Sequence, residues 1–377
     1  MTDLEVVERS IVYVGPMIQH GRTLRNIDSS DSVSGKKSSS DGRFRSLKRS
    51  GPRTWGVQSP IELIDVGVWT ADGDVGHGAA TRNKQWLISP ARPEFEFVRP
   101  TYRHMLKSGI ARAPDQYWNE ILAYRLGHYM GISVPPTHVA YNSLTREAGA
   151  LSEFFDYTAH AGGQSRFRSG SEVLALRSIT ERRDGRDHNF EAVSGWFTFL
   201  ERNRLMLDDW RDHWAQAFLL DSLIGNTDRH IDNWGALETT TRLGKTRFRL
   251  APLFDNGTSM GYELPVGRLD AMFREGSVPR YINKGTHQMF WRRADAARLS
   301  HPQFLKRFYD EFPGQRSGIE SRLQVSDRTL ERLLQELTQF RSPIPLNVDR
   351  ARLMLKLLKF RRDHLKETIF RRGPTLS

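Results

Sequence analysis

The sequence predicts a two-lobed α+β protein, in which a small β-rich unit precedes a larger, mainly helical one. Short apolar segments of strand-like composition concentrate before residue 155, whereas amphipathic helical patterns dominate the rest of the chain. A hairpin pattern interrupts the helical part. The 377 residues suffice for two or three domains, and 20 Phe, 9 Trp and 10 Tyr can fill a sizeable core, which excludes a wholly disordered chain.

Three parts are expected along the chain. Residues 1–58 form an N-terminal segment whose stretch from about 21 to 55 holds nine Ser and nine Lys or Arg and few apolar residues, which predicts a flexible arm. The arm is either a basic tether for nucleic acid or another partner, or a solvated linker. Residues 59–155 form the β-rich lobe and residues 156–377 the helical lobe.

The β-rich lobe has five expected strands and one helix. The strands are expected at residues 61–69, 85–89, 95–100, 137–141 and 148–155. A glycine-rich hairpin loop at residues 72–78 joins the first two. The apolar residues of 114–130 recur at helical spacing, and Gly131 stands where a left-handed cap ends a helix.

In the helical lobe, apolar residues recur at helical spacing over 213–224, and Gly225-Asn226 ends that helix. Residues 234–237 and 246–253 read as the two strands of a hairpin. Residues 301–370 are expected to form several amphipathic helices separated by prolines.

The net charge and the cysteine content limit the partners and the reactions that are expected of this protein. The net charge of +12 is typical of a protein with an anionic partner, although it does not choose among nucleic acid, a phosphorylated small molecule and an acidic protein. The absence of Cys excludes disulfides, Cys-ligated metals and a thiol nucleophile. No apolar run is long enough to span a membrane, and acidic residues stand where a secretory signal has basic ones, so a cytoplasmic location is expected.

The most informative stretch is residues 225–234, Gly-Asn-Thr-Asp-Arg-His-Ile-Asp-Asn-Trp, between the expected helix and the hairpin. Phosphoryl transfer uses such a loop, because an Asp must accept or orient the attacking hydroxyl while an Asn a few residues later holds Mg²⁺. Asp228 and Asn233 have this chemistry and this order.

A second segment, Leu253-Phe254-Asp255-Asn256-Gly257, follows the hairpin. An Asp there can return to the same site and bind Mg²⁺ beside the β- and γ-phosphates, as in the Asp-Phe-Gly segment of kinases. Asp, Asn and Gly are also the residues that turns select, so a purely structural origin is the alternative for either segment.

Together these two segments resemble the bacterial HipA-like kinase family, whose founding members are toxins of toxin–antitoxin pairs. Other stretches agree with the resemblance, which covers roughly residues 60–370: 118–121 resembles the αC-like helix, 149–155 the hinge strand, and 280–301 a downstream family segment.

The resemblance implies a protein-kinase-like fold that holds ATP and Mg²⁺ between a nucleotide-binding first lobe and a catalytic second lobe. Asp228 would be the catalytic base, with Asn233 and Asp255 as metal ligands. Glu153 to Phe155 would be the hinge whose backbone meets adenine, and Asp156 would lie near the ribose.

The sequence departs from the family pattern at one position. Family members read Phe-Lys-Pro where this chain has Phe97-Val98-Arg99-Pro100, so Arg99 is expected at the position of the phosphate-binding lysine. Arginine does not replace a compact ammonium without rearrangement. Lys84 could substitute for it or be a solvated residue at a strand end. Glu120 could pair with Arg99, as Glu does with Lys in kinases, or be solvated.

His230 and Arg229 are two further polar residues of the stretch 225–234. Zinc binding by His230 is improbable because no second His or Cys stands at ligand spacing, so a structural role that packs the loop is expected. Arg229 either contacts a substrate phosphate or pairs with Asp232.

The C-terminal residues 350–372 combine nine Lys or Arg with an apolar stripe. They form either a surface for nucleic acid or an acidic partner, or a packed helix with a solvated side.

The resemblance implies a serine/threonine protein kinase, with an aminoacyl-tRNA synthetase or another translation factor as its substrate and an antitoxin as a partner. Two alternatives stay open: a nucleotide-binding pseudokinase, suggested by Arg99, and a nucleic-acid-binding regulator that acts through the basic termini.

Overall fold

The structure is a computed structural model that describes residues 57–73, 84–155, 164–176, 185–240 and 244–370. These residues belong to one structural unit, Gly56–Ser377. The expected arm at residues 21–55 and most of the glycine-rich loop lie outside the described residues.

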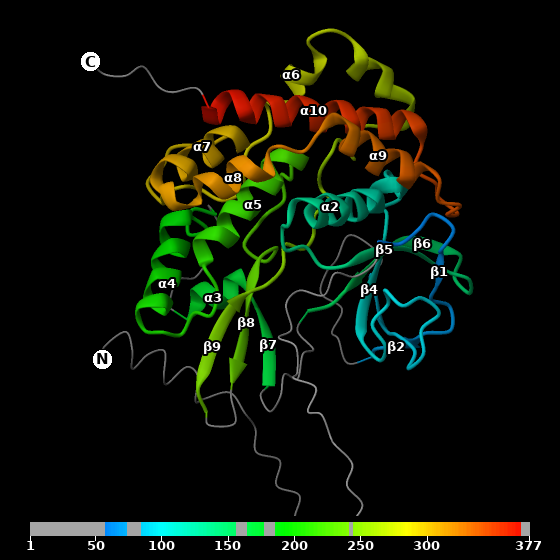
Figure 1. Ribbon diagram of the computed structural model, residues 1–377, viewed down its shortest axis with the longest axis horizontal. Coiled ribbons are helices and arrows are strands. Elements are labelled where there is room, and N and C mark those ends of the chain that lie inside the picture. Colours follow the sequence, from blue (N-terminus) through cyan, green and yellow to red (C-terminus); the bar gives the residue numbers. More distant parts are fainter. Residues whose placement is uncertain (1–56, 74–83, 156–163, 177–184, 241–243, 371–377) are drawn as a thin grey trace, which may run out of the picture. The chain divides into compact units, whose positions relative to one another are not determined.

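The first lobe is built on a six-stranded sheet of order β1-β5-β6-β4-β3-β2 (Figure 1). The pairing of β1 with β5 is parallel, and the other pairs are antiparallel. The strands are β1 (Ile64–Asp65), β2 (Thr70–Ala71), β3 (Lys84–Ile88), β4 (Arg103–Ser108), β5 (Thr137–Asn142) and β6 (Glu147–Glu153).

The expected strands at 85–89, 137–141 and 148–155 are confirmed to within about two residues, whereas the strand at 95–100 is wrong. That stretch forms turns, because the prolines at 93 and 100 supply no N–H to a strand ladder. The rings of Phe95 and Phe97 stack 5.3 Å apart and pack in the lobe's core without a strand. The strand is instead β4, which follows Pro100.

One helix, α2 (Tyr117–Met130), packs against β5 and β6 after a short 3₁₀ turn, η1 (Pro114–Gln116). It ends at Gly131, whose φ of 64° is the left-handed cap that the sequence predicts. Nearly every side chain of the helix is buried, so Glu120 lies in the interior instead of in solvent.

The second lobe is mainly helical, as expected. Its helices are α3 (Gly170–Ala175), α4 (Phe190–Arg202), α5 (Trp210–Ile224), η2 (Val266–Phe273), α6 (Ser277–Ile282), α7 (His301–Glu311), η3 (Pro313–Gln315), α8 (Arg316–Arg322), α9 (Asp327–Thr338) and α10 (Val348–Phe370). Helix α5 is buried on almost all sides and packs against α7, α8 and α10. It ends at Gly225, with φ 66°, and so confirms the predicted break.

A second, antiparallel sheet of order β7-β8-β9 belongs to this lobe. Strands β8 (Gly235–Thr240) and β9 (Thr246–Leu250) are the predicted hairpin, and β7 (Gln164–Ser169) is an additional strand that the sequence did not reveal. Among the described helices, none is both long and apolar enough to cross a bilayer. The two sheets and the surrounding helices confirm the mixed α+β class.

Candidate functional site

The loop after α5 is held by its own polar groups. The Asp228 N–H donates to Asn226 Oδ1 over 3.0 Å, and Asn233 Nδ2 donates to the Asp228 carbonyl over 2.6 Å. The Asp228 carboxylate is half-exposed and accepts a hydrogen bond of 3.3 Å from the Thr258 hydroxyl. The loop therefore presents the Asp228 carboxylate at the surface while its backbone is fixed.

The segment that contains Asp255 has an unusual backbone. Asp255 has φ 57° and Met260 has φ 49°, a left-handed region that L-residues other than Asn, Asp and Gly seldom adopt. Hydrogen bonds hold the segment in this form: the Ser259 hydroxyl donates to the Asn256 carbonyl over 2.6 Å, and Asn256 Nδ2 donates to the Leu253 carbonyl over 2.8 Å. The costlier left-handed residue is therefore Met260, because Asp255 is of a type that tolerates this region.

Arg229 links the Asp228 loop to the Asp255 segment from the interior of the protein. Its side chain is fully buried, and it binds the Asp221 carboxylate through Nε at 3.0 Å and Nη2 at 2.7 Å. It also donates to the carbonyls of Asn233 and Phe254 and to Asn256 Oδ1. Both roles considered for Arg229, a phosphate contact and a pair with Asp232, are wrong, because its partner is a buried carboxylate of α5.

The Asp221 carboxylate is ionised despite its burial. Burial alone would raise its pKa, but the Arg229 guanidinium and the nearby His287 hold the pKa of Asp221 well below its usual value. His287 Nε2 lies 3.5 Å from Asp221 Oδ2, and its Nδ1 accepts the Met289 N–H, so the Nε2 hydrogen faces Asp221. The Asp228 loop is thus anchored by a buried ion pair between Arg229 and Asp221, in which each charge compensates the other.

Lys107 is the cation of the first lobe that meets these segments. Its Nζ, buried at the end of β4, lies 3.5 Å from Glu120 Oε1 and 3.3 Å from Asp255 Oδ1. The other Glu120 oxygen accepts the Asn256 N–H over 2.8 Å. One helix carboxylate therefore contacts both the lysine and the Asp255 segment.

The expectation that Arg99 takes the lysine position and pairs with Glu120 is wrong. Arg99 Nη1 lies 3.4 Å from Glu153 Oε1, and its guanidinium stacks 3.7 Å above the Tyr102 ring. Glu153 is paired with His104, three residues before Lys107, and side chains at odd spacing project from opposite faces of a strand. Arg99 therefore binds on the face of the sheet opposite to Lys107.

Lys84 lies on the same face as Lys107. The two residues are directly opposite in the β3–β4 register, and directly opposed residues of an antiparallel pair project from one face with Cβ atoms about 5 Å apart. Lys84 is half-buried. It can therefore supplement the charge of Lys107 but cannot take its place beside Glu120.

Aromatic rings surround the expected hinge. Phe155 lies 5.3 Å from both Phe167 of β7 and Phe254, and Phe167 lies 5.6 Å from Phe254. All three rings are only partly buried. They form an apolar surface between the hinge and the Asp255 segment that suits a flat heterocycle. Asp156, the residue expected near the ribose, lies outside the described residues.

His230 is exposed, and its Nδ1 accepts the Asp232 N–H over 3.2 Å. The ring therefore supports the loop from the solvent side. The sequence predicts that it packs into the loop, which it does not do.

Asn233 and Asp255 carry the kind of oxygen donors that Mg²⁺ takes. The described residues contain no cluster of three or more His, Asp or Glu side chains that could cage a metal alone. Mg²⁺ commonly takes one or two protein ligands together with phosphates and water. Because Asn233 uses its Nδ2 on the Asp228 carbonyl, the amide oxygen remains as an acceptor.

The basic residues of α10 are engaged inside the chain. Arg350 binds Asp115 at 3.1 Å, Lys359 binds Asp327 at 3.0 Å, and Arg361 donates to the Ile224 carbonyl over 3.0 Å. The helix is therefore a packed element of the second lobe, which agrees with the structural interpretation of residues 350–372.

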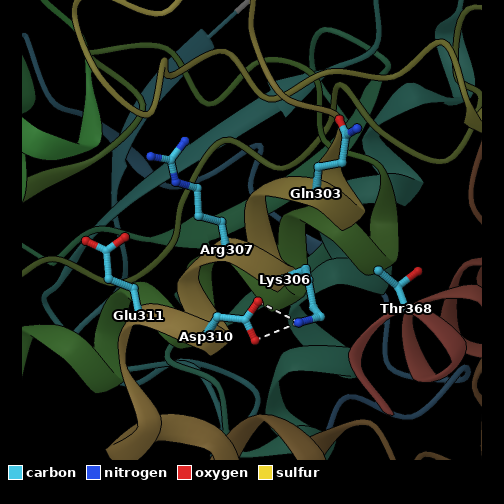
Figure 2. Close-up of a pocket in the computed structure, with 6 residues that line it drawn as sticks. All are labelled: Gln303, Lys306, Arg307, Asp310, Glu311 and Thr368. Carbon is cyan, nitrogen blue, oxygen red and sulfur yellow. Dashed lines mark hydrogen bonds and ion pairs between the residues drawn. The ribbon is translucent and has the colours of Figure 1, made fainter. Parts of the chain in front are cut away.

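The second lobe also has an open surface hollow, whose lining residues Figure 2 shows. It is lined by α7 and by one residue of α10: Gln303, Lys306, Arg307, Asp310, Glu311 and Thr368. Lys306 and Asp310 pair with each other across one helical turn. None of the expected site residues lines this hollow.

The β-rich lobe, the helical lobe and the loop pair at Asp228 and Asp255 define a protein with a kinase-like fold. The family model described as the HipA-like C-terminal domain matches residues 83–328, and the chain belongs to this family.

One solved structure shares the fold. The proinflammatory kinase CtkA of Helicobacter pylori superposes with a TM-score of 0.62 over 82% of this chain and 97% of its own, at 17% identity. HipA of Shewanella oneidensis MR-1, solved with HipB and operator DNA, gives a TM-score of 0.40 over 80% of this chain and 69% of its own, at 15% identity. No curated protein matches the chain significantly.

Lys107 is the main residue that sequence reasoning missed. The run from Tyr102 to Leu106 has the composition of a strand, and a lysine at its end faces an acidic helix residue, Glu120, a short distance along the chain. The resemblance of Phe97-Val98-Arg99-Pro100 to the family strand drew attention to the wrong basic residue.

Proposed function

We propose that this protein is an ATP-dependent kinase that transfers the γ-phosphate to a protein hydroxyl, with residues 59–155 as the nucleotide-binding lobe and 156–377 as the catalytic lobe. The observation that carries the proposal is the meeting of Lys107, Glu120 and Asp255 beside the Asp228 loop. A lysine held by a helix glutamate and an Asp on a metal-binding segment are the parts that kinases use to place the phosphates.

Each residue has a defined task in this reaction. Lys107 binds the phosphate oxygens, and Glu120 keeps its ammonium in place. Asp228 accepts the hydroxyl proton as the hydroxyl oxygen attacks the γ-phosphorus and the bond to the β-phosphate oxygen breaks. Asn233 and Asp255 would hold Mg²⁺, which neutralises phosphate charge when bound.

The nucleotide base is assigned to the hinge. The hinge of Glu153 to Phe155 meets adenine through the backbone groups that the sheet leaves available, since the Glu153 and Phe154 N–H groups donate to the Pro136 and Arg103 carbonyls. The cluster of Phe155, Phe167 and Phe254 offers an apolar surface to one side of the base. Lys84 adds positive charge near the phosphates. Asp156 would lie near the ribose, as the family resemblance implies.

The pseudokinase alternative rested on Arg99, and the position of Lys107 removes that reason. A Ser or Thr acceptor, an aminoacyl-tRNA synthetase or other translation factor as substrate, and an antitoxin partner follow from the family resemblance alone. The nucleic-acid alternative gains no support from three basic residues of α10, because Arg350 and Lys359 bind carboxylates and Arg361 binds a carbonyl within the chain.

The proposal is tested with purified protein, labelled ATP, Mg²⁺ and a cell lysate. We expect a labelled protein band that Asp228→Asn reduces by roughly 10²- to 10⁴-fold, the usual contribution of a positioned base. Asp232→Asn is the matched control, since Asp232 is an exposed carboxylate of the same loop that accepts the Ser171 hydroxyl. Labelling that is absent with wild type, or equal in Asp228→Asn and wild type, would refute the proposal.

A further inference from the structure

We infer that Arg229 is a positioning residue, whose guanidinium fixes the Asp228 loop and the Asp255 segment as one unit so that their side chains are presented to substrate together. This inference rests on the proposed kinase function. Arg229 touches none of the reacting atoms, because its side chain is fully buried.

The hydrogen bonds of Arg229 use all five guanidinium donors. Nε and one Nη2 hydrogen bind the two oxygens of Asp221. The other Nη2 hydrogen binds Asn256 Oδ1, and the Nη1 hydrogens bind the carbonyls of Asn233 and Phe254. The five acceptors come from α5, the loop and the Asp255 segment.

These acceptors flank the functional residues. The Asn233 carbonyl belongs to an expected metal ligand, and Phe254 and Asn256 are the neighbours of Asp255 on both sides. Since Asp255 and Met260 adopt left-handed φ angles, their segment needs an outside restraint to keep its form. The planar, rigid fork of arginine supplies it, whereas the three donors of a lysine ammonium cannot meet five acceptors.

The test compares Arg229→Lys with Arg350→Lys. Arg350 is a matched control, because it is also a buried arginine that binds a carboxylate, Asp115, and two carbonyls, but those carbonyls, of Gly261 and Leu264, lie after the segment that runs from Leu253 to Met260. In Arg229→Lys we expect kcat to fall by roughly a hundredfold, the usual effect of small misplacements, while the KM for ATP changes little. Arg350→Lys should lower the melting temperature without this loss of kcat.

Hydrogen exchange tests the restraint without any phosphoryl transfer. The Asn256 N–H bonds to Glu120 and the Asn233 N–H bonds to the His230 carbonyl, so both amides report on the two segments. We expect both amides to exchange faster in Arg229→Lys than in wild type, and neither to change in Arg350→Lys. If wild type transfers no phosphate, the proposed function fails while this measurement still decides the inference.

If Arg229→Lys does not fold, Asn256→Ala carries the test, since it removes one acceptor and leaves the pair with Asp221. We expect a smaller loss of kcat and faster exchange at Asn233. Equal losses of kcat in the two arginine variants, or unchanged exchange in Arg229→Lys and Asn256→Ala, would overturn the inference.

Discussion

Several histidines of this protein are buried, and burial disfavours their charged form. It lowers the pKa of His104 and His301 to about 4 and that of His138 to about 3. His301 is the most consequential for the site, because its Nε2 contacts the Asn226 carbonyl at 2.7 Å, directly before the Asp228 loop. These rings remain neutral in the folded protein at pH values where exposed histidines take up a proton.

Stability should therefore fall as the pH decreases from 6.5 toward 4. In that window the unfolded chain binds protons at its histidines, with a pKa near 6.5, whereas the folded chain does not, so the free energy of unfolding decreases. The shift at His301 alone corresponds to roughly 3 kcal/mol. The depressed pKa of Asp221 acts in the same direction at the acidic end of this window, because the unfolded carboxyl begins to bind a proton below about pH 5 while the folded one does not.

Urea unfolding between pH 7.5 and pH 4.5 measures this dependence. His301→Gln should be less stable than wild type at pH 7.5 but lose less stability on acidification. His128→Gln, which changes an exposed histidine at the end of α2, should keep the wild-type slope. A free energy of unfolding that does not change over this range would contradict the assignment of neutral buried rings.

At the scale of elements, two helices end at glycines in the same conformation but different surroundings. Gly131 ends α2 with φ 64°, and Gly225 ends α5 with φ 66°. A Cβ at Gly131 would meet nothing within 4 Å, whereas a Cβ at Gly225 would lie 2.1 Å from Arg361 Nη2. The end of α5, and with it the start of the catalytic loop, is thus packed against α10.

Replacing each glycine by alanine should separate the cost of a left-handed backbone from the cost of displacing Arg361. Gly131→Ala should cost about 1–2 kcal/mol, the backbone cost of a left-handed residue with a Cβ. Gly225→Ala should cost more by roughly 1–3 kcal/mol, because the buried Arg361 must move and lose its hydrogen bond to the Ile224 carbonyl. Denaturant unfolding at pH 7.5 measures both values, and equal costs would show that Arg361 does not restrain the end of α5.

The elements with strong local signals were predictable from sequence. Helices α2 and α5 carry periodic apolar residues and glycine caps, and the β8–β9 hairpin carries its own turn. Strand β4 was not predicted, because the aromatic residues at 95 and 97 alternate like a strand although prolines on both sides prevent one. Strand β7 pairs only with a partner far along the chain, so no local pattern marks it.

The residues of the candidate site also divide into those that a local sequence motif reveals and those that only distant contacts reveal. Asp228, Asn233 and Asp255 stand in compact motifs, whose residues can be picked out before any fold is known, and their catalytic roles stay predictions. The partners of Arg229 and Lys107 depend on burial and on contacts between elements distant in sequence, which no spacing encodes. The misassigned Arg99 shows that a basic residue in a familiar motif can face the other side of its sheet.

At the scale of the whole molecule, α2 connects the two lobes. Glu120 accepts the Asn256 N–H, and Asn119 donates to the carbonyls of Gly257 and Ser259. The Tyr117 hydroxyl also donates to the Ile344 carbonyl of the second lobe. The helix therefore sets the position of Lys107 relative to Asp255, so that residues of both lobes share one site.

The most direct measurement of this shared site compares Lys107→Met with Arg99→Met in transfer of phosphate from labelled ATP, at a temperature where both variants are folded. Because Lys107 contacts Glu120 and Asp255 while Arg99 lies on the other face of the sheet, Lys107→Met should reduce the rate by roughly a hundredfold or more. Arg99→Met should keep a rate close to that of wild type. Loss of transfer in Arg99→Met with full activity in Lys107→Met would contradict the account.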